Sequence, residues 1–435
     1  MKNFFLTLAV IICICASACA PVVPTAEPPV VPATPAATVV ATSVSTPNAV
    51  SESEFDGERA LEQNRMLAVT IGKRVAGTEG GTRAGNYIAD QFSSFGYQVE
   101  QQAFPFEAWE DRGTTVQVTA PETREIESQP IQYSPAGQVE APLVAVGGIG
   151  TADDFKQVDV KGKIALVARG TIPFSDKALN AVNAGAAAVL IYNNVPGLIV
   201  ATLRERVSIP AIVVSQESGN QLLDLLKRGA VTIKIASDTL IATKTGHNII
   251  AIRAGESDKT LVLGGHYDSV PAGPGANDNG SGTAVLLELA RALAQHSHKD
   301  TLIFIAFDAE ELGLVGSRYY VEHLDSAARA KIQAMLNFDM LGGGSGPLLL
   351  GGNGSIALTA RSSAQTLGIE AHNFTLGGGA GSDHESFQRA NIDTVFFSRD
   401  YTLLHTPQDV IDQVRAEYLA EAGRVAERVI ERLDE

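Results

Sequence analysis

Hydrophobic positions after residue 246 alternate between short apolar runs and longer amphipathic segments. This is the pattern of strands that alternate with helices. The expected strands cover 248–253, 260–265, 301–307, 334–338, 348–350 and 394–398. The expected helices cover 282–295, 356–366 and 409–433. Such an alternation predicts an α/β fold, in which helices cover both faces of a mainly parallel mixed sheet.

The first half of the chain has a different pattern. Residues 60–94 predict two helices with a glycine-rich break, and a strand follows from Tyr97 to about Phe106. Between 115 and 243, short strands are separated by proline and glycine. They are expected at 143–146, 163–168, 188–192 and 211–214, with helices near 177–184 and 216–227. We therefore expect one domain from 56–114 and 244–435, with a β-rich α/β domain, 115–243, inserted into it.

The N-terminal segment is typical of an export signal. Lys2 precedes an apolar stretch that ends at Ala18, so residues 1–18 are interpreted as a signal peptide. Ala16-Ser-Ala-Cys19 resembles a bacterial lipobox and also satisfies a signal-peptidase rule; we favour lipidation of Cys19. Residues 19–55 form a linker rich in Pro, Ala and Thr. The sequence thus predicts an exported protein, anchored by lipid at the cell surface or in the periplasm, or otherwise secreted.

Composition excludes several classes of function. The 435 residues carry a formal net charge of −16, whereas nucleic-acid binding needs a basic surface. No apolar run reaches the roughly 18 to 20 residues that span a bilayer. All three cysteines lie within the first 19 residues, so the processed chain has no internal disulfide, cysteine nucleophile or thiolate metal site. A possible lipid anchor is therefore the expected membrane contact, and no protein partner is indicated.

Carboxylates and an imidazole follow three of the expected strands, and a glycine-rich loop adds another acid. These residues are His266, Asp268, Asp278, Glu310, Glu311 and Asp339. Carboxyl ends of parallel strands meet at one edge of a sheet, so the side chains should gather there. With no lysine or arginine among them, the acids would repel one another unless cations were bound. Mixed imidazole and carboxylate ligands suit zinc.

Spacing suggests different roles within this group. His266 and Asp268 are two residues apart, so on a strand they face the same side, and Asp268 can orient the imidazole. Glu310 and Glu311 are adjacent and point differently, so one can bind metal while the other serves as the base of metal-assisted hydrolysis. A further ligand is needed for two metals. His405 and His384 are both candidates, and spacing leaves the choice open.

Together these residues resemble the co-catalytic di-zinc aminopeptidases, a superfamily that includes secreted bacterial leucine aminopeptidases, aminopeptidase Y and glutamate carboxypeptidase. The motifs are Gly-Gly-His266-Tyr-Asp268-Ser, Gly-Ala-Asn-Asp278-Asn-Gly, Asp-Ala-Glu310-Glu311-Leu-Gly, Asn-Phe-Asp339-Met, Gly-Ser-Asp383-His and His405-Thr-Pro. The resemblance covers 56–114 and 244–435 and implies a zinc-exopeptidase fold of the phosphorylase/hydrolase-like type. The insert resembles a protease-associated domain, from its strand order and the run Ala184-Gly-Ala-Ala-Ala-Val-Leu-Ile-Tyr192.

The resemblance implies a role for each matched residue. It assigns one zinc ion to His266 and Asp339, a second to Glu311 and His405, and the bridge between them to Asp278. Glu310 is then the general base. In the family an aromatic residue commonly precedes the last histidine and helps the oxyanion, but Leu404 stands there in this chain. Tyr401 is a candidate substitute, and Asp383 is a second candidate for the substrate pocket.

The resulting hypothesis is a zinc-dependent exopeptidase, an aminopeptidase that removes N-terminal residues from peptides. A zinc carboxypeptidase is the first alternative; it needs arginines to bind a C-terminal carboxylate, and Arg361, Arg389 and Arg399 are available. A non-catalytic receptor domain would be expected to lose ligands or the base, yet all six positions are filled. A single-zinc acyltransferase of the glutaminyl-cyclase type would be expected to lose part of the two-metal set.

Overall fold

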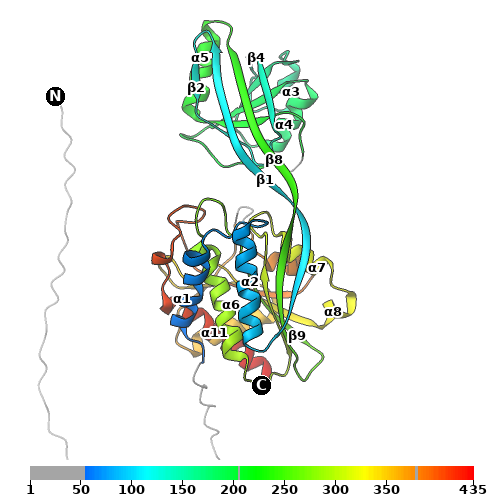
Figure 1. Ribbon diagram of the computed structural model, residues 1–435, viewed down its shortest axis with the longest axis vertical. Helices are drawn as coiled ribbons and strands as arrows, with labels where there is room; N and C mark the ends of the chain where they lie inside the picture. Colours follow the sequence, from blue (N-terminus) through cyan, green and yellow to red (C-terminus); the bar gives the residue numbers. More distant parts are fainter. Residues whose placement is uncertain (1–53, 204–205, 378–380) are drawn as a thin grey trace, which may run out of the picture. The chain divides into compact units, whose positions relative to one another are not determined.

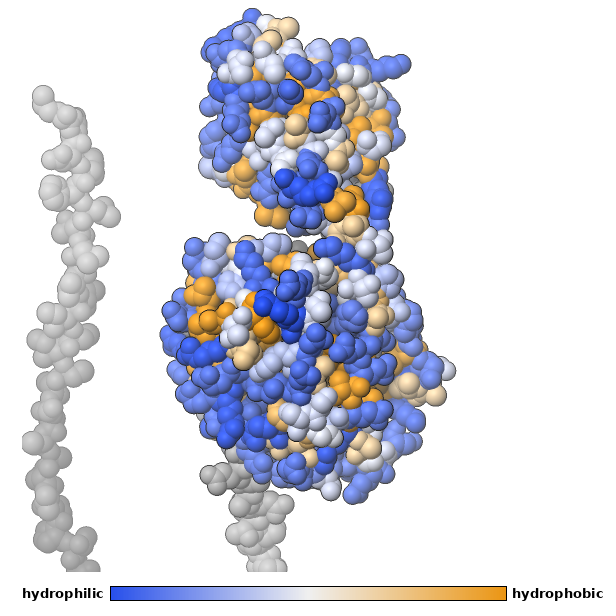
Figure 2. Space-filling view, viewed as in Figure 1, coloured by the Kyte–Doolittle hydropathy of each residue, from blue (hydrophilic) through white to orange (hydrophobic). Residues whose placement is uncertain are grey.

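The computed structural model describes residues 54–203, 206–377 and 381–435. The expected signal peptide, Cys19 and most of the linker 19–55 lie outside the described residues. Within these ranges, no helix is both long and apolar enough to cross a bilayer. Polar and charged residues cover most of the described surface visible in Figure 2, and apolar residues form small groups between them.

The first part of the fold is a mixed sheet in which parallel pairs predominate. Its strand order is β13-β12-β14-β11-β9-β10-β8. The strands are β8 (Thr232–Arg253), β9 (Thr260–His266), β10 (Thr301–Phe307), β11 (Ile332–Phe338), β12 (Leu348–Gly352), β13 (Ala371–Asn373) and β14 (Asp393–Ser398). The neighbours β10, β9, β11 and β14 run parallel, whereas β8 and β12 pair antiparallel with this group. The mainly parallel sheet predicted from the sequence is confirmed.

Helices cover both faces of this sheet (Figure 1). One face, with Leu261 and Leu263, packs against α1 (Gly57–Arg65), α2 (Glu79–Ser94), α6 (Gly282–Leu293), α9 (Gly354–Thr366) and α11 (Ala416–Asp434). The opposite face, with Val262, packs against α7 (Val315–Glu322) and α10 (His384–Arg389). Because successive strand residues point to opposite faces, β9, whose residues are all buried, is covered on both sides. Shorter helical segments are η1 (Met66–Ile71), η2 (Ala276–Ser281), α8 (Ser326–Lys331) and η3 (Ile411–Gln413).

The second part of the fold continues from two long strands. β1 (Gln98–Ala120) pairs antiparallel with β8 from Gln98 opposite Ile252 to Ala120 opposite Thr232. Beyond the first sheet the order is β8-β4-β5-β6-β7-β3, and β2 pairs with β1. These elements are β2 (Arg124–Ile126), β3 (Ser128–Pro130), β4 (Gly137–Ala145), α3 (Ala152–Lys156), β5 (Ile164–Ala168), α4 (Phe174–Asn183), β6 (Ala188–Tyr192), β7 (Ala211–Val214) and α5 (Gln216–Arg228). Two apolar clusters fill this part, one on each side of its strands.

Several predicted boundaries are wrong. The strand expected at 248–253 begins at Thr232, and the one expected at 143–146 begins at Gly137. The strand expected to end near Phe106 continues to Ala120, because β8 provides a hydrogen-bonding partner along its whole length. The last helix begins at Ala416 instead of residue 409, and Arg415 before it is extended. The side chain of Asp409 is instead bonded to the backbone of Asn277 and Asp278, which ties this part of the chain to another loop.

We predict that Gly265→Ala destabilises the sheet beside the carboxyl ends of its strands. A Cβ atom at Gly265 would lie 2.5 Å from the carbonyl oxygen of Phe338, so β9 and β11 would have to separate. The expected loss is about 1–3 kcal/mol of unfolding free energy, measured by denaturant titration. Gly147→Ala is the matched control, since a Cβ there meets no described atom within 4 Å. Equal stability of the two variants would contradict the close approach of β9 and β11.

Candidate metal centre

The four parallel strands end at one edge of the sheet and deliver the candidate residues there. β9 ends in His266, Glu310 and Glu311 follow β10, Asp339 follows β11, and the loop that carries His405 follows β14. Asp278 lies in η2, between β9 and α6. The structure thus brings together the residues that the sequence singles out as metal ligands and base. Their chain separation is large, so the sheet topology is what makes them neighbours.

The carboxylate of Asp278 lies between two groups of side chains. Its Oδ1 is 3.3 Å from Nε2 of His266, and that nitrogen is 3.5 Å from Oδ1 of Asp339. Its Oδ2 is 3.2 Å from Nε2 of His405, and that nitrogen is 3.0 Å from Oε2 of Glu311. One carboxylate therefore faces two separate donor sets with different oxygens, which is the arrangement that a bridging ligand requires.

Buried oxygen atoms at this edge fit bound cations. Oε1 of Glu311 and Oδ1 of Asp339 are buried and accept no hydrogen bond from the described residues. Donor atoms of His266, Asp278 and Glu311 lie within 4.8 Å of one another, as do those of His266, Glu310 and Asp339. A buried carboxylate oxygen without a partner is costly, and a cation would satisfy it. The nitrogen and oxygen donors present are those that zinc accepts.

The electrostatics of the group favour positive charge. Hydrogen bonds to Asp278 and Glu311 raise the pKa of His405 to about 10. Burial raises the pKa of Glu310 well above its usual range, and nearby carboxylates, including Asp383, add to this effect. Burial, with the neighbouring Asp278, raises the pKa of Glu311 to about 7. These shifts share one cause, the burial of several carboxylates close together, and a bound cation would oppose them.

Asp268 supports the metal ligands in two ways. Nδ1 of His266 is hydrogen-bonded to the backbone carbonyl of Asp268 at 3.2 Å, and Oδ1 of Asp268 lies 3.4 Å from the same nitrogen, so this residue orients the imidazole. The same carboxylate accepts hydrogen bonds from the backbone N–H groups of Glu310, at 3.1 Å, and Glu311, at 3.3 Å. The strand-face argument is wrong in detail, because β9 ends at His266 and Asp268 reaches the imidazole from the following loop. Asp268 therefore links the ends of β9 and β10.

Asp409 supports the loop that carries Asp278 and was not identified from the sequence. It accepts hydrogen bonds from the backbone N–H groups of Asn277, at 2.8 Å, and Asp278, at 3.0 Å. The hydroxyl of Tyr401 donates to Asp409 at 3.1 Å, so Tyr401 lies beside the loop that carries Asp278. The one sequence signal was proximity, since Asp409 lies four residues after His405 in the same loop.

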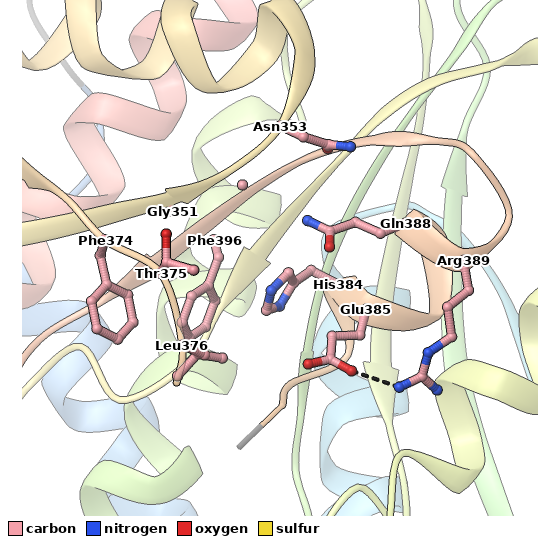
Figure 3. Close-up of a pocket in the computed structure, with 11 residues that line it drawn as sticks. Gly351, Asn353, Phe374, Thr375, Leu376, His384, Glu385, Gln388, Arg389 and Phe396 are labelled. Carbon is pink, nitrogen blue, oxygen red and sulfur yellow. Dashed lines mark hydrogen bonds and ion pairs between the residues drawn. The ribbon is translucent and has the colours of Figure 1, made fainter. Parts of the chain in front are cut away.

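His384 does not join the metal centre. Its ring stacks on Phe396 with centroids 4.6 Å apart, and it lines a separate cavity of about 320 Å³ together with Phe374 and Gln388 (Figure 3). Burial lowers the pKa of His384 to about 4, so the imidazole is neutral at pH 7. Of the two histidines, His405 is the one that lies beside Asp278 and Glu311. Asp383, the preceding residue, is fully buried, and burial raises its pKa to about 7.

The arginines considered for carboxylate recognition have partners within the protein. Arg389 pairs with Glu385 at 2.6 Å, as Figure 3 shows, and Arg399 pairs with Glu421. Arg361 donates to the side chain of Asn373. One arginine outside the acidic motifs does lie near the acids: the fully buried Arg74 interacts electrostatically with Asp268 and Asp278. Arg74 lies far before these acids in the sequence, and no local pattern marked it.

The fold and the site together define an α/β protein with a two-metal centre of carboxylates and histidines. Residues 248–430 match the model of Peptidase family M28, and residues 139–222 match that of the PA domain. Aminopeptidase YwaD of Bacillus subtilis is 34% identical over 399 residues, which is 86% of this chain and 84% of that protein. The chain therefore belongs to peptidase family M28, with a protease-associated domain inserted in it.

Two further comparisons agree with this assignment. A solved structure described as BSAP, a zinc aminopeptidase from Bacillus subtilis, superposes with a TM-score of 0.74 at 32% identity, over 88% of this chain and 96% of that one. The probable leucine aminopeptidase 2 of Aspergillus oryzae is 37% identical over 296 residues, 67% of this chain. The match spans 59% of that relative's length.

We predict that Asp278→Ala lowers the occupancy of both metal positions, because its two oxygens face both donor sets. His405→Ala should lower mainly the occupancy of the position beside Glu311. The metal-to-protein ratio, measured by elemental analysis after equilibration with limiting zinc, distinguishes the two outcomes. His372→Ala is the control, since this exposed histidine pairs with Glu370. A bridging role is ruled out if Asp278→Ala and His405→Ala lose the same single ion.

Proposed function

We propose that this chain is a zinc-dependent aminopeptidase that removes N-terminal residues from peptides. The observation that carries the proposal is the carboxylate of Asp278, whose two oxygens face two separate donor sets, with Glu310 beside them. The metal-free exopeptidases and the single-metal alternatives do not need such a bridging carboxylate. The names of the M28 relatives, among them a zinc aminopeptidase, support the same activity.

The described residues divide the work of peptide hydrolysis. His266 and Asp339 would hold one zinc ion, Glu311 and His405 the other, and Asp278 both. Bound zinc supplies a water molecule of lowered pKa and stabilises negative charge on the carbonyl oxygen. Oε2 of Glu310 lies 3.9 Å from Nε2 of His266, at the edge of the ligand set. From this position Glu310 accepts the proton of the attacking water and later donates it to the leaving amine.

The charge of the site favours a peptide amine over a peptide carboxylate. Glu310, Asp339 and the buried Asp383 are acidic groups close to one another, and a protonated N-terminus would be attracted to them. A carboxypeptidase needs a cation that is free to bind the substrate carboxylate. Each of the three arginines considered for that task is bonded to another residue of the protein. This contrast supports the aminopeptidase over the carboxypeptidase.

A cavity of about 490 Å³ beside the metal centre is a place for the substrate's apolar parts. It borders Glu311 and Asp268, and its walls include the apolar side chains of Trp109, Val270 and Leu312. Apolar walls that meet a few charged groups are typical of substrate sites. We infer that side chains of the peptide lie here while its scissile bond lies at the metals. The hydroxyl of Tyr401 donates to Asp409, so it would have to leave this bond to donate to the oxyanion of the substrate. The role of Tyr401 as an oxyanion donor therefore stays a prediction.

The remaining assignments complete the proposal. The peptidase domain comprises 56–114 and 244–435, and the protease-associated domain comprises 115–243. Residues 1–18 direct export, and Cys19 carries the lipid that anchors the enzyme. The mass of the mature N-terminus, measured on protein purified from a bacterial membrane fraction, tests the anchor. A first residue other than a lipidated Cys19 would contradict it.

We expect protein from residue 50 onward, loaded with zinc, to remove the first residue of a leucine-containing peptide. Blocking the amine or adding a chelator should abolish the reaction, and blocking the carboxyl group should not. Mass spectrometry follows the products of three versions of the peptide: one with free ends, one with a blocked amine and one with a blocked carboxyl group. Loss of the last residue, prevented by the carboxyl block and by the chelator but not by the amine block, would instead establish a carboxypeptidase. If none of the three peptides is hydrolysed although zinc is bound to the protein, a non-catalytic binding role is favoured.

Glu310→Gln tests the base. The amide has similar size but cannot accept the proton, so kcat should fall by about 10²–10⁴-fold. Zinc content should stay close to that of the unaltered enzyme, because Asp339, Glu311, His405 and Asp278 still provide ligands. Glu322→Gln, at an exposed position of α7, is the matched control. Full turnover by a zinc-loaded Glu310→Gln enzyme would refute the assignment.

A further inference from the structure

We propose that Arg74 is a positioning residue that shapes the loop from Tyr267 to Asp278 for metal binding. Arg74 lies between η1 and α2 and is fully buried. This inference rests on the proposed zinc site, because its consequence is a change in zinc affinity. No motif in the sequence connects Arg74 with the ligands.

The guanidinium of Arg74 holds both ends of that loop. Its Nε donates to the carbonyl oxygen of Tyr267 at 2.7 Å, one residue after the ligand His266. Its two Nη atoms donate to the carbonyl oxygens of Pro274, at 2.5 Å, and Gly275, at 2.8 Å. Gly275 lies three residues before Asp278. One planar group thus fixes the chain just after one ligand and just before the bridging ligand.

Further contacts make the loop a tightly specified element. The backbone N–H of Arg74 donates to Oγ of Ser269 at 3.0 Å. Gly275 has φ of 60°, and a Cβ atom there would lie 2.3 Å from the carbonyl oxygen of Asp278. Asp409 holds the N–H groups of Asn277 and Asp278 on the other side. Without the guanidinium, three carbonyl groups at the start and end of the loop lose a charged donor, and the loop is free to relax.

The charge of Arg74 acts at longer range. The hydrogen bonds of its guanidinium go to backbone carbonyls, and among the described residues no carboxylate forms an ion pair with it. Burial lowers its pKa to about 10, so it stays charged at pH 7, and Asp268, Asp409 and Asp278 oppose that shift. The charge of Arg74 and its hold on the loop have opposite effects on zinc affinity. Removing a nearby cation would by itself tighten zinc binding, whereas releasing the loop weakens it.

The test measures zinc affinity of the full chain by competition with a chromophoric chelator. We expect Arg74→Met to bind zinc about 10- to 100-fold more weakly, the usual loss when a group that holds metal ligands is removed. Arg74→Lys keeps the charge, yet one ammonium cannot reach three separate carbonyls, so its affinity should fall as well. Arg83→Met is the matched control, because the exposed Arg83 donates to the carbonyl of Ile71.

Thermal unfolding with and without zinc separates positioning from general stability. Weaker zinc binding makes the zinc-induced rise in Tm smaller in Arg74→Met than in the unaltered chain. A merely structural role would lower both Tm values equally and leave the rise and the affinity unchanged, and this result overturns the proposal. Tighter binding by Arg74→Met also overturns it. If Arg74→Met does not fold, Arg74→Lys decides, and unaltered affinity in that variant counts against positioning. An unaltered chain without zinc affinity would refute the proposed function itself.

Discussion

Mutual repulsion among buried carboxylates is the constraint on which this structure depends. At one edge of the sheet, Asp278, Glu310 and Asp339 lie around His266, and Glu311 lies beside His405, with little water to screen these acids. Such a group is stable only if positive charge lies among the acids. Two imidazoles lie there, and the raised pKa of His405 shows how strongly the acids favour a cation. The same feature that makes the group costly makes it a site for divalent metal ions.

The surrounding hydrogen bonds serve mainly to hold the ligands at fixed positions. Asp268 receives the N–H groups of Glu310 and Glu311, and Asp409 receives those of Asn277 and Asp278. In both cases a carboxylate binds backbone, so it fixes the chain that carries a ligand instead of competing for the metal. The supporting residues come from distant segments, and each joins two of the loops at the sheet edge. The ligand geometry is therefore a property of the whole edge.

The long strand β8 connects this edge with the rest of the chain. At its carboxyl end it pairs with β10, the strand that precedes Glu310 and Glu311, and at its other end it pairs with β4 of the inserted domain. β1 accompanies it throughout, which satisfies the backbone groups of both strands where no sheet continues. The insert is thus attached by two paired strands, and its own cores lie on the two sides of β5, β6 and β7.

The sequence alone determined the central strands of the sheet and the types of side chain that follow them. Alternating apolar runs located the strands that end at His266, Phe307 and Phe338, since burial on both faces leaves an unmistakable pattern. The acids directly after those strands followed from the rule that parallel strands share an edge. Only the tertiary structure shows that His405 lies beside Glu311 and that His384 stacks on Phe396 instead. The neighbours of an imidazole depend on where its loop folds back. The positions of Arg74 and Asp409 next to the site were also revealed only by the tertiary structure. Their contacts are with backbone groups of distant loops, and backbone groups carry no sequence signal.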